Sequence, residues 1–583
     1  MESKKVVYSN KKGSKSSTTR ANKNRISKRR PLNRFSLEKD TENVSTSAKK
    51  LKMSEGEYEI QVDRSFGYRF INFIAVFSAI SELVVCKKCG SNIKFNEACN
   101  RGLGFKIVVV CDKCEPSFIN ASPLINNHAY DINRRIIFAM RLLGIGLNGI
   151  TKFCAFMDLP HPIFQSFYDT VVGAISVATT AVCEKSIKKA VAEEKKISLE
   201  QGQTTGLTVS GDGSWRKRGF SSLFGIAALI GWHTGKILDV LVKSKYCKAC
   251  EFWNTKKDAV EYEEWSQLHN EECDINHEGS SGKIEVDAIV EMFSRSETLH
   301  GVKYCQYIGD GDSKTFKGII DAQPYADITV SKKECIDHVQ KRMGTRLRDL
   351  KKKTKGLGEK GKLTGKLIDE LTIYYGLSIR RNCNSIEKMK KEIWATLYHK
   401  ISTDEKPQHD YCPSGADSWC SWQKAKAFDN LEEYTHKTPL NKEVFNVIRP
   451  IYEDLSNDDL LNRCLGGFTQ NNNESFNAVV WSLAPKTFAS GQIILDIATD
   501  IAVCKFNDGF ASIMAIMQVL NMTIGHNMYT FCIEADARRV KAAERAMSSY
   551  AKEARKLSRM SRKEEDEANF DVEGQLYGAG IAE

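Results

Sequence analysis

Two short stretches of the sequence place an aspartate beside glycine directly after a run of β-forming residues. They are VSGDGSW at 209–215, which contains Asp212, and QYIGDGDSK at 306–314, which contains Asp310 and Asp312. The glycines allow a sharp backbone turn and the close approach of a phosphate. Two neighbouring carboxylates raise each other's pKa unless a cation lies between them, and Mg²⁺ prefers oxygen ligands. The pattern predicts that each stretch supplies part of one divalent-metal site.

A third carboxylate is expected on a helix that passes under the strand ends. The segment FTQNNNESFNAVVWSLAPK at 468–486 fits, because its asparagines can cap a helix that has Glu474 in the first turn. An apolar stripe would hold this helix on the core, and it consists of Phe476, Val479, Val480 and Leu483. Glu474 is therefore the expected third ligand.

The elements around these acids follow a recognisable order. Three strands are expected first, at 206–212, 221–232 and 237–244. They are followed by a helix at 286–300, a strand at 302–310, a helix at 313–323 and a short strand at 328–333. A three-strand meander followed by alternating helix and strand is the order of the ribonuclease H-like α/β fold. In that fold the first and fourth strands are neighbours, which would place Asp212 beside Asp310.

The cysteines point to zinc rather than to disulfides. The chain has 18 cysteines and no secretory signal at its start, so reduced thiols are expected. The pairs Cys86/Cys89 and Cys111/Cys114 form a C-x2-C…C-x2-C pattern beside β-rich segments, which predicts a structural zinc ribbon that leaves Cys99 outside the site.

Two further sets have metal-ligand spacing. Cys247, Cys250, His269 and Cys273 form a C-x2-C…H-x3-C pattern that suits a second tetrahedral zinc. A looser third set would need a long insertion to fold back on itself, and it is compatible either with zinc or with ordinary buried thiols and polar histidines. Its members are Cys335, His338, His409 and Cys412, with Cys420 nearby.

A helical region separates the zinc ribbon from the first aspartate. Apolar residues recur at helical spacing through 132–143, a second helix is expected at 147–157, and a third follows Pro160 and Pro162. This arrangement fits a helix-turn-helix module that binds DNA, and it fits a plain helical linker equally well.

Positive charge is concentrated in three stretches of a chain of 583 residues with net charge +12. Residues 1–50 hold 15 Lys or Arg against four acids, residues 341–366 hold 11 against two, and residues 538–563 hold 10 against two. These stretches sum to +28, so the rest of the chain is near −16. Basic arms on an acidic body favour contacts to a nucleic acid over solvated surfaces alone.

The residues expected to contact DNA belong to three groups of basic side chains: Arg216, Lys217 and Arg218; Lys341, Arg342, Arg346 and Arg348; and Arg555, Lys556 and Arg559. Lys28, Arg29 and Arg30 form a nuclear-import patch within a disordered arm, so a nuclear location is expected. The sequence has no run of 18 apolar residues, and we expect neither membrane spanning nor a small-molecule substrate.

Several motifs, in order, resemble the Mutator-like transposase family over about residues 60–545. They are GDGSWRKRGFSS, SKYCKAC, GDGDSKTF, KKECIDHVQKRMGTRLR, CPSGADSWC and QNNNESFNAVVW. The resemblance implies a cut-and-paste DNA transposase with an Asp-Asp-Glu site, whose acids by position are Asp212, Asp310 and Glu474. Asp312 is an alternative to Asp310, and Cys335 and His338 match the family's C-x2-H signature.

The resemblance also implies the cofactors and partners. These are two Mg²⁺ or Mn²⁺ ions, terminal inverted repeats and target DNA, with assembly as a homo-oligomer on DNA. Two alternatives are a domesticated zinc-dependent DNA-binding protein without catalysis, and a nuclease or resolvase of the same fold that never joins strands. DNA binding alone, cleavage alone, or cleavage with joining would distinguish the three.

The expected organisation has seven parts. They are a disordered basic arm at 1–55, the zinc ribbon at 56–125, the helical module at 126–200, the first part of the ribonuclease H-like core at 201–340 with a zinc-knuckle insertion at 244–280, a mainly helical insertion at 341–465, the last part of the core at 466–535, and a basic helix and tail at 536–583.

Overall fold

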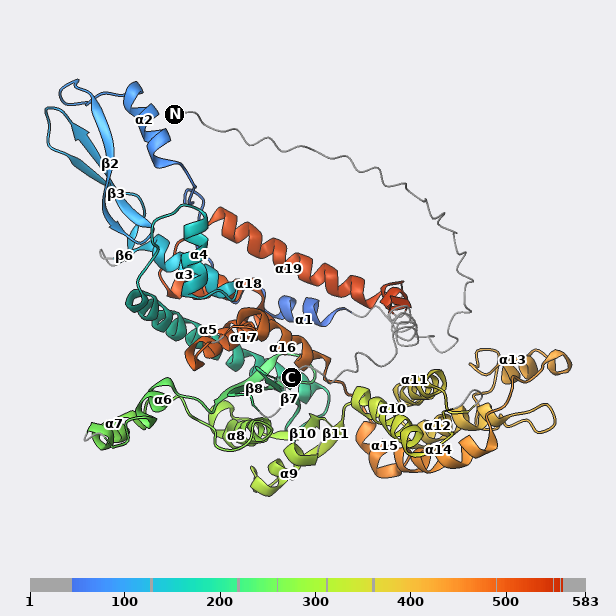
Figure 1. Cartoon of the computed structure of the whole chain (residues 1–583). Coiled ribbons are helices and arrows are strands. Elements are labelled where there is room, and N and C mark those ends of the chain that lie inside the picture. Colours follow the sequence, from blue (N-terminus) through green and yellow to red (C-terminus); the bar gives the residue numbers. More distant parts are fainter. Residues whose placement is uncertain are drawn as a thin grey trace, which may run out of the picture.

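The protein has a mixed α/β architecture with several small sheets and many helices (Figure 1). The computed structural model describes residues 44–558 except 126–128, 218–220, 259–260, 311–312, 359–361, 489, 549 and 556. The nuclear-import patch, Arg218, Asp312, Lys556 and Arg559 therefore lie outside the described residues.

A five-stranded sheet with the order β11-β10-β7-β8-β9 forms the centre. Its strands are β7 (Leu207–Trp215), β8 (Phe224–Gly231), β9 (Ile237–Ser244), β10 (Tyr304–Gly309) and β11 (Ser331–Glu334). The first three form an antiparallel meander, whereas β10 pairs in parallel with both β7 and β11. The order along the chain, including α8 (Lys283–His300) and α9 (Ser313–Ala322), is the predicted one.

The two faces of the sheet are covered by different helices because side chains alternate along each strand. On β8, Ile226, Ala228 and Ile230 pack into the core formed with α5 (Gln165–Glu200), α16 (Asn471–Leu483) and α17 (Gln492–Asp508). The intervening Ala227 and Leu229 pack against α8 on the other face. The sheet is thereby buried on both sides.

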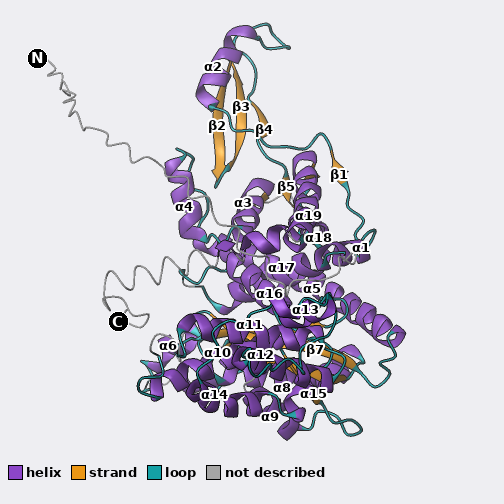
Figure 2. Ribbon diagram, turned by 90° about the vertical axis from the view of Figure 1, so that its right-hand side faces the viewer, coloured by secondary structure: helices purple, strands orange, loops and turns teal. Residues whose placement is uncertain are grey.

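An N-terminal sheet of three antiparallel strands projects from the body of the protein (Figure 2). It consists of β2 (Ile93–Arg101), β3 (Gly104–Cys111) and β4 (Ser117–Asn120), and α2 (Phe73–Leu83) packs against it. Only Gly104 and Val108 are buried in its middle strand, and neither outer strand buries any residue. This sheet has almost no hydrophobic core of its own.

The predicted helical module contains α3 (Asp131–Leu142), α4 (Leu147–Phe156) and α5. The first two meet at 111°, and the third is a single helix of 36 residues. Among the described helices, α5 alone is long and apolar enough to cross a bilayer. If the bent α3–α4 pair is counted as one span, there are up to two such candidates. The apolar side chains of α5, such as Val172, Ile175 and Val182, are buried in the central core.

A helical unit with its own core lies between β11 and α16 on one side of the sheet (Figure 1). It contains α10 (Ile336–Lys353), α11 (Gly365–Arg381), α12 (Ile386–Ile401), α13 (Ser421–Ala427), α14 (Lys442–Leu455) and α15 (Asp458–Cys464). Its entry and exit are joined, because the Ile336 amide donates a hydrogen bond to the Phe468 carbonyl at 3.0 Å. The insertion expected at 341–465 falls within this unit.

The end of the expected disordered arm is instead part of the core. Residues 46–53 form α1 (Thr46–Met53), which is capped by the Ser45 side chain, and β1 (Val62–Asp63) pairs in parallel with β12 (Ile524–Gly525). The prediction was wrong here because the lysines that suggested disorder include Lys50, which is buried over the Phe506 ring at 3.3 Å. Burial, with Arg539 and Lys236 nearby, lowers the pKa of Lys50 well below its usual range.

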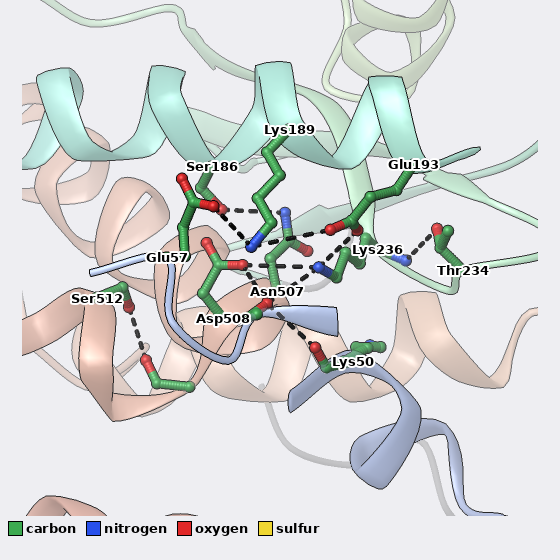
Figure 3. Close-up of polar contacts among 12 residues, drawn as sticks. Lys50, Glu57, Ser186, Lys189, Glu193, Thr234, Lys236, Asn507, Asp508 and Ser512 are labelled. Carbon is green, nitrogen blue, oxygen red and sulfur yellow. Dashed lines mark hydrogen bonds and ion pairs between the residues drawn. The ribbon is translucent and has the colours of Figure 1, made fainter. Parts of the chain in front are cut away.

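A buried ionic network fixes this N-terminal segment to the sheet and to α17 (Figure 3). The fully buried Lys236 ammonium lies 2.7 Å from a Glu193 carboxylate oxygen and 3.7 Å from one of Asp508. It also donates to the Ser54 hydroxyl at 3.1 Å, which in turn donates to Asp508 at 2.7 Å. One lysine thus joins α1, α5, α17 and the β8–β9 turn.

Replacing Lys236 by methionine should destabilise the protein by about 3–5 kcal/mol, because the side chain keeps its volume while Asp508 is left as an uncompensated buried charge. Urea unfolding would measure this. The control is Lys185→Met, since Lys185 is 55% exposed in its pair with Glu57 and should cost at most about 1 kcal/mol. Equal effects of the two variants would contradict the importance assigned to the buried network.

Candidate active site and zinc centres

The two aspartates lie where the parallel pairing of β7 with β10 ends. Asp310 directly follows β10, whereas β7 continues past Asp212 to Trp215, beyond the strand end that the sequence predicted. Strand β10 pairs with β7 so that Ile308 lies opposite Ser210. Asp310 and Asp212 each come two residues later along the chain, and their charges influence each other through space. The structure therefore brings together the two aspartates that the sequence analysis paired.

Helix α16 contacts the same part of β7, next to Asp212, and carries the glutamate there. The Asn473 amide donates to the Ser210 and Ala228 carbonyls at 3.2 and 3.4 Å, and its oxygen accepts from the Ser210 hydroxyl at 2.7 Å. Gln470, one turn earlier, donates to the Gly211 carbonyl at 2.7 Å. These contacts fix the first turn of the helix, which carries the exposed Glu474.

The pKa of Asp212 is raised to about 6, mainly by burial, with smaller contributions from the negative charges of Glu474 and Asp310, while His338 opposes the shift. A carboxylate whose pKa is raised by burial and by neighbouring negative charges is typical of functional sites. The arrangement supplies oxygen ligands and negative charge for a hard divalent cation, which is what the donor set of a magnesium site requires.

Two polar side chains that the sequence analysis did not assign to this site support the acids. Asn477 donates to an Asp212 carboxylate oxygen at 2.9 Å, and His338 Nδ1 lies 2.9 Å from Asp310 Oδ1. This contact raises the pKa of His338. Glu474 and Asn477 are three residues apart and therefore lie on one face of the helix, so the sequence could have indicated Asn477 as a neighbour of the site. No feature of the sequence indicated that His338 contacts Asp310.

Two cysteine-rich groups have the geometry of zinc sites. In each of them the four candidate ligand atoms lie within 4.8 Å of one another. In the ribbon, Cys86 Sγ lies 3.8 Å from Cys114 Sγ, and Cys89 Sγ lies 3.4 Å from Cys111 Sγ. These distances fit thiolates around one tetrahedral zinc.

The second group lies in the excursion after β9, which contains α6 (Lys248–Asn254) and α7 (Glu261–His269). Cys247 Sγ lies 3.3 Å from His269 Nε2, and Cys250 Sγ lies 3.5 Å from Cys273 Sγ. The Trp265 ring stacks on the His269 ring at 4.6 Å and fixes its orientation. The four residues predicted for this site are thus brought together.

The third predicted set is not brought together, and its composition must be corrected. Cys335 is buried at the start of α10, and His338 contacts Asp310. His409 and Cys412 instead lie with His399 and Cys420 in the helical insertion. The C-x2-H pair failed as a zinc half-site because its histidine lies at the entry to the insertion, beside the acids.

Comparison with family models gives one decisive match. Residues 67–420 match the model of the Mutator-like transposase, a span of 354 residues that covers more than half of the chain. The chain belongs to the Mutator-like transposase family. A comparison with curated proteins gave no match. The matched span includes both aspartates, while Glu474 lies beyond it.

The basic side chains that the sequence analysis expected to contact DNA are largely held by contacts within the fold. On α10, Arg342 pairs with Glu334, Arg346 with Asp454 at 3.1 Å, and Arg348 with Asp369 at 2.8 Å. Arg216 donates to the Ser490 carbonyl at 2.8 Å. Lys217, Lys341 and Arg555 are exposed. To bind the arginines of α10, DNA phosphates would have to displace the acidic side chains that now pair with them. The three exposed side chains need no such exchange.

Replacing Asp212 by asparagine should stabilise the metal-free protein above about pH 6. The folded pKa near 6 exceeds the ordinary value of 3.8, so the ionised carboxylate is penalised in the fold, and the penalty disappears as the pH falls toward 4. The gain at pH 7.5 should be on the order of 1–3 kcal/mol.

Urea unfolding at pH 7.5 and at pH 4.5 would measure this gain, which should be largest at pH 7.5. Mg²⁺ should stabilise the parent but not the variant. A gain in unfolding free energy that is equal at both pH values would contradict the raised pKa of Asp212.

Proposed function

We propose that this protein is a DNA transposase that cleaves and joins phosphodiester bonds at the terminal inverted repeats of a Mutator-like element. Membership of the family supports the class of reaction. The observation that carries the mechanism is the convergence of Asp212, Asp310 and Glu474 at one end of the β7–β10 pair, where their charges interact. We propose these three acids as the catalytic metal ligands.

The proposal includes a ribonuclease H-like core. The sheet order β11-β10-β7-β8-β9, with an antiparallel meander and two parallel strands, supports it. The cover of α8 on one face and α16 and α17 on the other is consistent with that fold. The helical insertion then separates the second aspartate from the glutamate.

Two Mg²⁺ or Mn²⁺ ions held by the acids would activate a water or a DNA 3′-hydroxyl and stabilise the leaving oxygen. Neighbouring side chains orient the two aspartates. Asn477 orients the Asp212 carboxylate, and His338 holds Asp310 through its Nδ1. His338 is therefore a positioning residue of the proposed site rather than a zinc ligand.

The remaining parts of the protein would bind DNA. The zinc ribbon and the α3–α4 pair would recognise element ends, and exposed lysines such as Lys217 and Lys341 would contact the phosphate backbone. Assembly as a homo-oligomer on DNA and action in the nucleus belong to the same proposal.

One incubation of the pure protein with labelled element-end DNA, target plasmid and Mn²⁺ tests the function. We expect both cleavage at the element end and joined products. Cleavage without joining would favour a nuclease of the same fold, and binding without cleavage would favour a DNA-binding protein that has lost catalysis. Either of these outcomes would overturn the transposase proposal.

A further inference from the structure

Four potential metal ligands meet inside the helical insertion. His399 lies in the last turn of α12, His409 and Cys412 lie in the loop that follows, and Cys420 caps α13. Cys420, His409 and Cys412 are buried, with exposures of 0%, 2% and 4%. All four ligand atoms lie within 4.8 Å of one another.

The distances between these atoms match the edges of a zinc tetrahedron. Bonds of about 2.05 Å to nitrogen and 2.3 Å to sulfur give edges of about 3.3 Å between two nitrogens and about 3.6 Å between nitrogen and sulfur. His399 Nδ1 and His409 Nδ1 are 3.2 Å apart. Cys420 Sγ lies 3.6 and 3.3 Å from these two nitrogens, and Cys412 Sγ lies 3.9 and 3.8 Å from them.

The surroundings orient His409 as they do around metal-bound histidines. With Nδ1 on a metal, Nε2 carries the proton, and two acceptors lie 2.9 Å from it, Ser402 Oγ and His436 Nε2. His436 is itself held by Asp404 at 2.6 Å. The Trp422 ring stacks on His409 at 4.8 Å with an interplanar angle of 14°. The imidazole is therefore fixed on every side except the one that faces the other ligands.

The loop that carries three of the ligands has little else to hold it. Between α12 and α14 the described elements are only α13 and the short 3₁₀ helix η1 (Leu431–Glu433), neither of which has a buried residue. The local apolar cluster consists of Ala395, Cys412 and Cys420, with Trp419 and Trp422 against it. Two of its three buried members are the candidate ligands themselves.

We propose that His399, His409, Cys412 and Cys420 bind a structural zinc ion that holds the loop between α12 and α14 against α12. This site is separate from the acids and does not depend on the proposed catalysis. It brings the expected zinc content of the chain to three ions, two in the sites with predicted spacing and one here.

The test uses the full-length protein, purified without added chelator, and measures zinc per chain by elemental analysis. We expect three ions in the parent and two in His399→Ala. The matched control is Cys383→Ser, which changes a half-exposed cysteine of the same insertion that belongs to none of the three groups, and it should keep three. Equal zinc content in the parent and in His399→Ala would overturn the proposal.

A second measurement on the unmodified protein guards against misfolding of the variant. Alkylation followed by mass spectrometry should label Cys412 and Cys420 only after a zinc chelator is added. Cys464 is fully buried in the main core of the insertion and should stay protected, which provides an internal control. Protection of Cys412 and Cys420 that is unaffected by the chelator would mean that packing, not zinc, holds the loop.

Discussion

Replacing Glu474 by glutamine should lower strand cleavage by several orders of magnitude, each equivalent to about 1.4 kcal/mol of transition-state stabilisation. Glutamine preserves the shape of the side chain and its place in the first turn of α16, which Asn473 and Gln470 fix independently. It removes the charge that the proposed metal pair needs. DNA binding should be unchanged or tighter, because the change removes a negative charge near the phosphates.

Single-turnover cleavage of a labelled element end in Mn²⁺, with a gel-shift assay on the same DNA, separates the two effects. Glu534→Gln is the control, since this exposed glutamate on α19 (His526–Met547) removes the same charge away from the aspartates. Cleavage by the Glu474→Gln protein at the parental rate would rule out the proposed mechanism.

Replacing Cys86 by serine should remove one zinc ion and unfold the projecting sheet of β2, β3 and β4. Structural zinc contributes on the order of 10–16 kcal/mol to the folding of small zinc peptides. The sheet buries only Gly104 and Val108 in its middle strand and no residue in the outer two, so it has no comparable substitute for the metal. Hydrogen exchange should become fast across these strands and stay slow in the buried strand β8.

Cys99→Ser is the matched control, because this exposed cysteine lies on β2 and outside the ligand group. It should keep the parental zinc content and slow exchange. A Cys86→Ser protein that holds the parental amount of zinc, or whose projecting strands remain protected, would contradict a structural zinc in the ribbon.

Local patterns in the sequence indicated the elements that carry the candidate sites. The β-forming runs before Asp212 and Asp310 end as neighbouring strands, and the asparagine-rich start of α16 carries Glu474 to the same place. The two C-x2-C pairs of the ribbon and the C-x2-C…H-x3-C pattern indicated two ligand groups, because residues at such short spacings lie close together in the chain.

The features that the sequence did not reveal depend on contacts between distant segments. His399 lies on a helix with no nearby cysteine in the sequence and becomes a candidate ligand only because the following loop folds back onto α12. Lys50 belongs to a basic stretch typical of a disordered arm. Only its burial against the Phe506 ring, far away in the sequence, identifies it as a core residue. No local spacing encodes either contact.

The connection between the helical insertion and the central sheet lies close to the proposed active site. The chain segments that enter and leave the insertion are joined by the hydrogen bond from the Ile336 amide to the Phe468 carbonyl. His338, which contacts Asp310, lies two residues after Ile336 in the first turn of α10. A tilt of α10 relative to the sheet would therefore change the distance between His338 and Asp310, a carboxylate of the proposed active site.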